Sequence, residues 1–427
     1  MMPLSAAKSE IVAAIFAAAP SEALQRLELV LTRAKAADSG FEPVHALAAA
    51  EVGRRRIVFE VFEPLVPLTV RAALPKIARL TQGQLNTAWR AVAAADPDLA
   101  GRVEAAVKTY RRHGPPPVLD EACLLAAELT GERDPDLHRL LRLAPVLRRV
   151  QEKLDLWTRN VSGESIAAIR LAFKDALIVD EDAGPVFWEA IFAMLNQPWQ
   201  VIRLISAAID RPSDRYLAAS ELGPMGERLL DDIDRRIVSL KNFDPDLGEA
   251  GGAAEAASVV IAVHQITEFE EWLALNRGGP WGQRIAEQKK ALALSMEARL
   301  RETEPAVAQA LPTQPARGAG RTVRPAPKLV ADPQPLVVNR ADALLTLAEE
   351  ARSAANAGGF AALRSSTWES LEKRLEQYSE DLLELLHRGE GDEPERMRAY
   401  LEIAARFTAL VKGPEMAQII RRRAAAA

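Results

Sequence analysis

The sequence predicts an all-α protein, and three observations support this fold class. Apolar residues recur every three or four positions along most of the chain, and no window keeps the strict alternation of a strand. Alanine, leucine, glutamate and arginine dominate, while aromatic residues make up only 5%. Asp, Pro and Gly mark the ends of the periodic segments, as they do at helix starts and stops. We therefore expect a large multi-helix N-terminal domain, either a bundle or an irregular α-solenoid, and a small C-terminal helical bundle.

One stretch of the N-terminal part is apolar on nearly every side. It reads PVFWEAIFAMLNQPWQVIRLISAAI, and a helix of this kind must be covered by other elements. Charged residues and an Asn-Gln-Pro break interrupt it, whereas a membrane span needs roughly 20 apolar residues in a row. Pro198 suits the first turn of a new helix, where its missing N–H is not needed. The stretch thus predicts two buried helices, Pro185–Leu195 and Pro198–Ile209, that meet at a bend.

The tetrapeptide Asp-Pro-Asp-Leu occurs three times, at Asp96–Leu99, Asp134–Leu137 and Asp244–Leu247. Asp is a good N-cap, Pro suits the first helical position, and a second acid faces the positive end of the helix dipole. The spacing of the first two copies is near that of helical-hairpin repeats. The flanking residues do not match, so a capping device used three times is favoured over a true solenoid.

A segment rich in proline and glycine, residues 311–340, marks the clearest domain boundary. It is basic, and its charged residues are Arg317, Arg321, Arg324, Lys328 and Arg340 against the single Asp332. Such a composition is typical of a flexible tether, and a docking peptide is the alternative. We expect an all-helical domain over residues 1–310, with a sub-boundary near 114–117, and a helical bundle over residues 341–427.

The C-terminal bundle contains one sharply periodic helix. Its apolar positions are spaced 3, 4, 3, 4 and 3 apart, as in a heptad seam, and they are Trp368, Leu371, Leu375, Tyr378, Leu382 and Leu385. Ser366 and Glu369 resemble a capping box at its start. The seam is shorter than three heptads, which favours packing within the chain over a homo-oligomer or docking seam, although both stay open.

Composition narrows the class of protein. The net charge of −5 argues against a general nucleic-acid binder, which usually carries a basic face. The single cysteine, Cys123, lies among leucines and alanines and is expected to be a small buried side chain. Lys8 precedes the apolar run Ile11–Ala19, but Glu10 borders that run. This favours an amphipathic first helix over a signal peptide, and a cytoplasmic location.

Motifs that carry chemistry are missing from the sequence. It contains no GxxxxGK[ST], GxSxG, HExxH or CxxC pattern, and we expect no catalytic residues, no metal ligands and no cofactor. The acidic runs Asp180–Asp182 and Asp231–Asp234 are expected to complement a helix dipole and to form a solvated helix face. A polar site in the helical core is the alternative, and its candidate residues are Glu189, Arg203, His264 and Glu268.

The leading functional hypothesis is a non-catalytic scaffold or adaptor of a bacterial cytoplasm that binds one or more protein partners. It rests on the many helical surfaces and on the tether that joins two folded parts. A ligand- or metal-binding enzyme or sensor with a site in the helical core is the second hypothesis. Peripheral membrane contact through the first helix is the third, and neither a nucleic-acid partner nor a transmembrane segment is expected.

Overall fold

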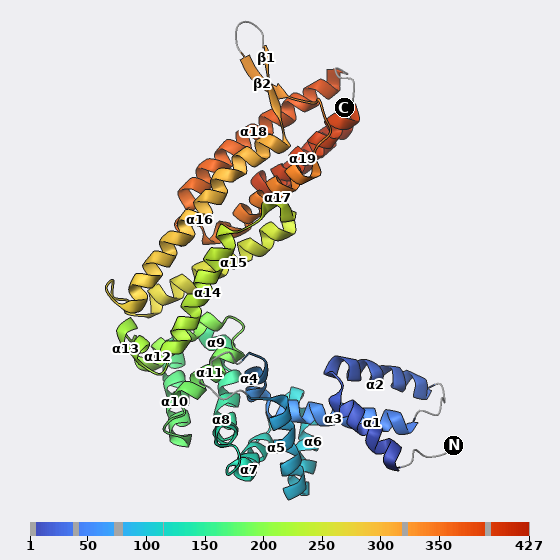
Figure 1. The fold of residues 1–427 in the computed structure, drawn as a ribbon, viewed down its shortest axis with the longest axis vertical. Coiled ribbons are helices and arrows are strands. Elements are labelled where there is room, and N and C mark those ends of the chain that lie inside the picture. The colour runs from blue at the N-terminus through green and yellow to red at the C-terminus, as the bar shows by residue number, and fades with distance from the viewer. Residues whose placement is uncertain are drawn as a thin grey trace. The chain divides into compact units, whose positions relative to one another are not determined.

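The computed structural model describes residues 6–36, 42–71, 80–113, 115–317, 323–388 and 394–426. Within these ranges the chain forms twenty α-helices, four short 3-10 helices and one two-stranded sheet (Figure 1). The all-α prediction is therefore confirmed. The chain divides into two compact units, Met1–Asp210 and Arg211–Ala427, which are described separately below as unit 1 and unit 2.

Unit 1 consists of short helices. Their bounds are α1 Ala6–Ala18, α2 Ser21–Ala36, α3 Glu42–Val61, η1 Glu63–Leu65, α4 Val66–Arg71, α5 Gln82–Ala95, α6 Pro97–His113, α7 Val118–Thr130, α8 Pro135–Gln151, α9 Leu154–Arg159, α10 Gly163–Val179, α11 Gly184–Met194, η2 Pro198–Gln200 and α12 Val201–Ile209. Helices α1 and α2 both pack on α3. They share a small core with it, made by Phe16, Leu24, Leu31 and Ala48.

The predicted central pair of helices is confirmed as α11 and α12. Trp188 and Phe187 of α11 and Leu204 of α12 are almost completely buried. Helix α11 ends where Leu195 becomes extended. Pro198 then begins the 3-10 turn η2 that leads into α12. The break occurs here because a proline without an N–H fits a first turn and not a helix interior.

All three Asp-Pro-Asp-Leu segments cap helix starts, as predicted. In each one, the first aspartate accepts a hydrogen bond from a backbone N–H of the following turn. The pairs are Asp96 Oδ1 with Leu99 N (2.8 Å), Asp134 Oδ1 with Leu137 N (3.1 Å) and Asp244 Oδ1 with Asp246 N (3.0 Å). The third copy opens a 3-10 turn, η3, directly before the long helix α15.

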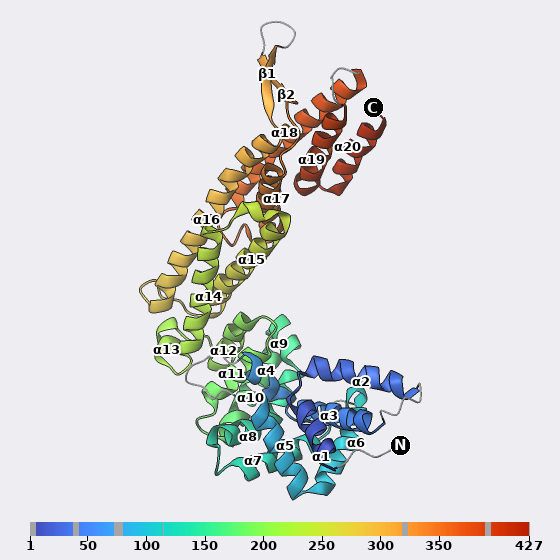
Figure 2. The ribbon, with the colours of Figure 1, turned by 45° about the vertical axis from the view of Figure 1, so that its right-hand side comes forward.

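Unit 2 consists mainly of long helices (Figures 1 and 2). Its elements are α13 Asp214–Ala219, α14 Gly223–Lys241, η3 Pro245–Leu247, α15 Gly248–Trp272, α16 Pro280–Ala310, β1 Thr313–Arg317, β2 Val323–Pro327, α17 Pro335–Glu350, η4 Ala351–Ala354, α18 Ala361–Arg388, α19 Pro394–Lys412 and α20 Pro414–Ala426. Helix α17 contacts α15, α16 and α19. Eight consecutive residues of it, 341–348, are buried, so α17 is a central helix of this unit.

The expected boundary over residues 311–340 differs from the division that the structure shows. Helix α17 begins at Pro335, inside the predicted tether, and packs against α15, which was assigned to the other domain. The two backbones are in close contact at Gly252, where a Cβ atom would lie 2.3 Å from the Ala343 carbonyl oxygen. The prediction treated prolines as breaks, but Pro335 stands at a helix start, where proline is well tolerated.

The remainder of the predicted tether contains the hairpin β1–β2. Ala326 faces Gln314, and the hydrogen bond from Lys328 N to Pro312 O marks the even-numbered pairs as the hydrogen-bonded ones. Pro315, Pro325 and Pro327 therefore all occupy non-hydrogen-bonded positions. At these positions a backbone N–H would point away from the partner strand, so its absence does not disturb the hairpin. The prolines also leave the outer edges of the hairpin with few donors for a further strand.

The heptad positions of α18 are buried within unit 2, except Leu385, which is partly exposed. Helix α18 lies against α16 and α19, so these side chains pack inside the chain. The predicted capping box is wrong. The helix begins at Ala361, and Ser366 donates to the Leu363 carbonyl oxygen from inside it.

Candidate interaction site

The exposed face of α1 is apolar over two turns. Ile11 and Ile15 are 61% and 59% exposed, and the alanines at 13, 14, 17 and 18 are exposed beside them. On the opposite side Phe16 is buried against α3. The sequence suggested an amphipathic first helix, but from Ile11 to Ala18 both faces of α1 are apolar. Leu29 and Val30 of α2 are also exposed, and we call α1 and α2 together the N-terminal arm.

Three consecutive arginines of α3 connect the arm to the rest of unit 1. Arg54 donates to Asn86 Oδ1 of α5 (3.0 Å). Arg55 donates to the carbonyl oxygens of Phe16, Ala17 and Ala19 at the end of α1 (2.9, 3.2 and 2.8 Å), and Arg56 donates to Val107 O of α6 (3.2 Å). The arginines thus hold three different elements, and Arg55 supplies a donor to carbonyls at the end of α1, where helical N–H partners run out.

Glu51 holds the first two of these arginines in place. Its oxygens accept from Arg54 at 2.6 and 2.8 Å and from Arg55, four residues further along the helix, at 2.9 Å. Burial alone would raise the pKa of the Glu51 carboxyl, but the two guanidinium hydrogen bonds outweigh it and lower that pKa. Glu51 is therefore charged at neutral pH and fixes both side chains.

A cavity of about 740 Å³ lies where the arm joins α3 and α5. Its apolar wall includes Leu24, Val52 and Phe59, and its polar wall includes Arg56 and Asn86. Phe59, in the last turn of α3, is 47% exposed, which is unusual for a phenylalanine. A volume of this size, with an apolar lining and a few polar groups, is typical of sites that receive a ligand or a partner side chain.

The end of α3 behind this cavity is fixed by a buried arginine. Arg148 of α8 is 3% exposed and donates to Glu60 O (3.1 Å) and Val61 O (2.6 Å). Its Nε donates to Asp120 Oδ1 of α7 (3.0 Å). Cys123 lies beside it, completely buried as predicted, and burial raises the pKa of its thiol to about 12, so the thiol is not a reactive nucleophile.

The four residues of the predicted polar core site are divided between the units. In unit 1, Glu189 is buried and Arg203 donates to the Thr158 carbonyl oxygen (2.6 Å). In unit 2, His264 is exposed and Glu268 is buried. The proposed convergence of all four remains a prediction. Among the described residues, no group of three or more His, Cys, Asp or Glu side chains is arranged to hold a metal ion.

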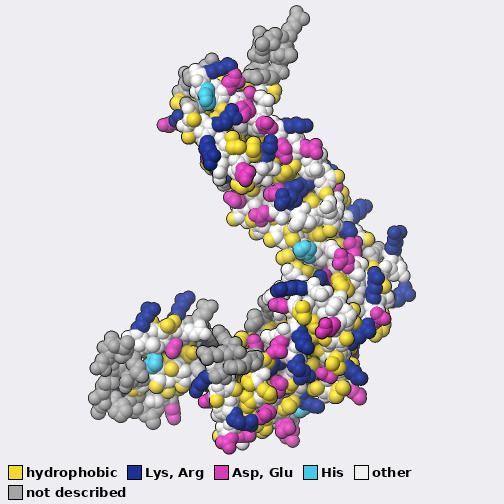
Figure 3. Space-filling view, turned by 180° about the vertical axis from the view of Figure 1, so that it is seen from behind, with side chains coloured by type: hydrophobic (Ala, Val, Ile, Leu, Met, Phe, Trp, Pro, Cys, Tyr) yellow, Lys and Arg dark blue, Asp and Glu magenta, His cyan; other side chains and the backbone are white. Residues whose placement is uncertain are grey.

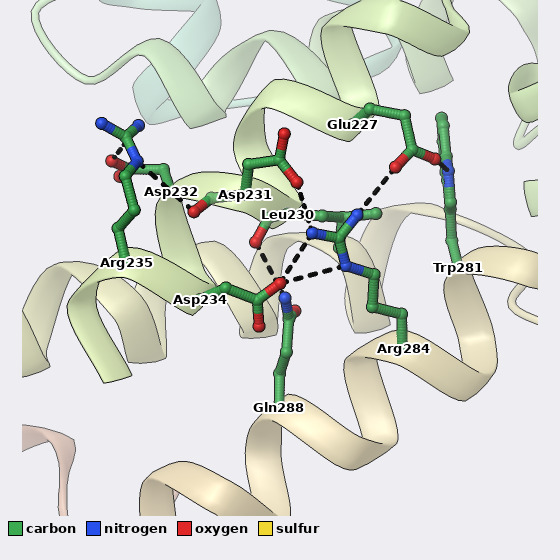
Figure 4. Close-up of polar contacts among 9 residues, drawn as sticks. All are labelled: Glu227, Leu230, Asp231, Asp232, Asp234, Arg235, Trp281, Arg284 and Gln288. Carbon is green, nitrogen blue, oxygen red and sulfur yellow. Dashed lines mark hydrogen bonds and ion pairs between the residues drawn. The ribbon is translucent and has the colours of Figure 1, made fainter. Parts of the chain in front are cut away.

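The acidic run of α14 is a helix-helix contact that sequence reasoning missed (Figure 4). Arg284 of α16 points between Glu227, Asp231 and Asp234, at 2.7 Å from Glu227 Oε2 and 2.6 Å from Asp234 Oδ2. Trp281 Nε1 donates to the other oxygen of Glu227 (2.6 Å). The acids occupy one face of α14 at helical spacing, but nothing in the sequence indicates which arginine faces them.

Asp342 of α17 is a buried acid whose surroundings destabilise its ionised form. Its side chain lies against Arg406 of α19, which donates to it. Burial raises its pKa, Arg406 lowers it, and the nearby Glu249 raises it further, with a net value of about 6. The ionised form is therefore disfavoured in the folded state.

Basic, acidic and hydrophobic side chains are interspersed on the face that Figure 3 shows, so no single sign of charge dominates it. No helix within the described ranges combines the length and the apolar character needed to cross a membrane. Comparison with protein-family models, with curated proteins and with solved structures finds no match to this chain.

Proposed function

We propose that the chain is a non-catalytic helical scaffold or adaptor that binds a partner protein through the N-terminal arm. The observation that carries the proposal is the apolar exposed face of α1, which presents Ile11 and Ile15 to solvent. Single exposed apolar residues are ordinary, but a helix face without any polar side chain over two turns is typical of a contact surface.

The energetics suit a protein contact. Burying a large aliphatic side chain completely gains about 1.5–3 kcal/mol, and both isoleucines still have more than half of their surface to bury. The adjoining cavity adds a place for an anchoring side chain, with Phe59 in its wall. Anchors that enter a pocket beside an apolar surface are the usual source of binding energy at protein interfaces.

The test is affinity capture from the lysate of the host with the whole chain as bait. The double variant I11E/I15E places two charges on the α1 face. The matched control L171E/I178E changes two residues of α10 that are equally exposed and apolar. We expect a defined partner to be lost with I11E/I15E and retained with the control. An unchanged set of captured proteins contradicts the proposal.

Peripheral membrane contact is a second candidate function, because a lipid surface could also cover the apolar face of α1. Flotation with neutral and anionic vesicles distinguishes the two. Flotation of the unaltered chain that is abolished in I11E/I15E favours the membrane. Absence of flotation, together with specific loss of a captured protein, favours the scaffold.

A further inference from the structure

We propose that unit 2 contains a binding site for a small phosphorylated molecule, held by Arg211 and Arg277. Both residues line a cavity of about 400 Å³ at the connection between α15 and α16, near the start of α13. This site is separate from the N-terminal arm and does not depend on the function proposed for it.

A buried carboxylate makes the frame of the cavity rigid. Asp214 is completely buried, and its oxygens accept from the backbone N–H groups of Arg215 (2.8 Å), Gly282 (3.2 Å) and Asn276 (3.4 Å). The loop closes so tightly on it that a Cβ atom at Gly279 would lie 2.0 Å from Asp214 Oδ2. The loop that carries Arg277 is therefore held in one conformation.

The segment that carries Arg211 is attached to the same loop. Ser213 and Ala274 form a parallel bridge. Ala274 N donates to Pro212 O (3.2 Å), and Asp214 N donates to Ala274 O (3.4 Å). Arg211 has a φ of 55°, a left-handed conformation that costs a non-glycine residue roughly 1–2 kcal/mol. Backbone strain of this kind is concentrated at functional sites, where it fixes the direction of a side chain.

The charges around the cavity leave two guanidinium groups without a counter-charge. Neither Arg211 nor Arg277 forms an ion pair with any residue that the structure describes. The acid in the cavity wall, Glu270, already receives Lys289 Nζ on both oxygens (3.0 and 2.8 Å), and Asp214 is occupied by backbone donors. A phosphate dianion matches two guanidinium groups in charge and in bidentate geometry.

The other walls indicate the rest of the ligand. Leu273, Ala274 and Leu275 also line the cavity, and its volume exceeds that of a bare phosphate and suits a small organic molecule. The ligand class is therefore a phosphomonoester with a compact apolar body.

Calorimetric titration of the whole chain with inorganic phosphate and with phenyl phosphate, at constant ionic strength, tests the site. We expect saturable binding of both, with phenyl phosphate about tenfold tighter and benzoate weaker than either. The double variant R211Q/R277Q keeps the backbone conformation but removes both charges, and we expect its affinity to fall about tenfold or more. R215Q is the matched control, since Arg215 is exposed, lies four positions after Arg211 in the sequence and does not line the cavity.

Circular dichroism of each variant verifies that it is folded. Absence of saturable phosphate binding by the unaltered chain overturns the proposal. Equal affinities in R211Q/R277Q and the unaltered chain overturn it as well, as does an equal loss in R215Q. Tighter binding of benzoate than of phenyl phosphate would assign the site to carboxylates and contradict the phosphate class.

Discussion

Replacing Arg148 by methionine is expected to loosen one part of unit 1 and nothing else. The methionine preserves most of the side-chain volume but removes the charged donors. The carbonyl oxygen of Glu60, at 3.1 Å from the guanidinium, loses this donor at a buried helix end, and that of Val61, at 2.6 Å, keeps only the Cys123 thiol as a donor. Asp120 loses its hydrogen bond as well.

The magnitude follows from burial. Each carbonyl left without a donor costs about 1–3 kcal/mol, and breaking a buried ion pair by removing one partner costs about 3–5 kcal/mol in total. Asp120 is about one-third exposed, so water recovers part of its loss, and we expect about 3 kcal/mol. Because 1.36 kcal/mol corresponds to one factor of ten, this is about a hundredfold change in an opening equilibrium.

Hydrogen exchange followed by mass spectrometry of the whole chain measures this change by region. Amides of α3, α7 and α8 should exchange about a hundredfold faster in R148M, whereas those of α14 to α16 should be unaffected. R102M is a matched control, because Arg102 pairs with Glu121, the neighbour of Asp120, at 2.8 Å but with both side chains more than half exposed. Its effect should stay below about 0.5 kcal/mol. Equal effects of the two variants would refute the reasoning from burial.

Three further predictions concern unit 2. The pKa of Asp342 is raised from 3.8 to about 6, so the folded state holds this proton more tightly than the unfolded state. Unit 2 should therefore gain stability as pH falls through 6 and lose it as pH rises. D342N should stabilise it at pH 8 by up to about 3 kcal/mol, and urea unfolding of this variant should depend less on pH. In G252A the new methyl group meets the α17 backbone and should lower the free energy of unfolding by about 1–3 kcal/mol. In the control G101A the methyl group enters open space, and this variant should gain about 0.5–1 kcal/mol. Thermal unfolding of both variants measures the difference. R284M should lower the free energy of unfolding by about 1 kcal/mol at low salt and by less in 1 M NaCl, because the acidic partners of Arg284 are about half exposed or more. A loss of stability that does not depend on salt would contradict an electrostatic origin.

Several features could be predicted from the sequence because they depend on residues that are close together along the chain. The Asp-Pro-Asp-Leu segments cap helix starts because the donors and the acceptor lie within one turn of each other. The buried pair α11 and α12 was predictable because an apolar stretch interrupted by a proline at a first turn has few alternatives. The burial of Cys123 followed in the same way from its apolar neighbours.

The candidate sites were not readable in this way. The sequence shows that α1 is apolar, and an apolar helix is expected to be buried. Only the structure shows which side of α1 is covered by α3 and which side is left exposed. Arg211 and Arg277 lie 66 positions apart in the numbering, and no local pattern connects them. They line the same cavity because Asp214 organises the loop between α15 and α16.

The sequence by itself determined that this protein is helical, where many of its helices begin, and which side chains avoid water, since these properties depend on neighbours within a few residues along the chain. Only the tertiary structure decided that α17 belongs in the middle of the second unit, that prolines of the supposed tether form a hairpin, and that the acids of α14 surround Arg284. Those outcomes depend on which surfaces meet across long stretches of chain, and periodicity describes the face a helix buries without naming the partner that covers it.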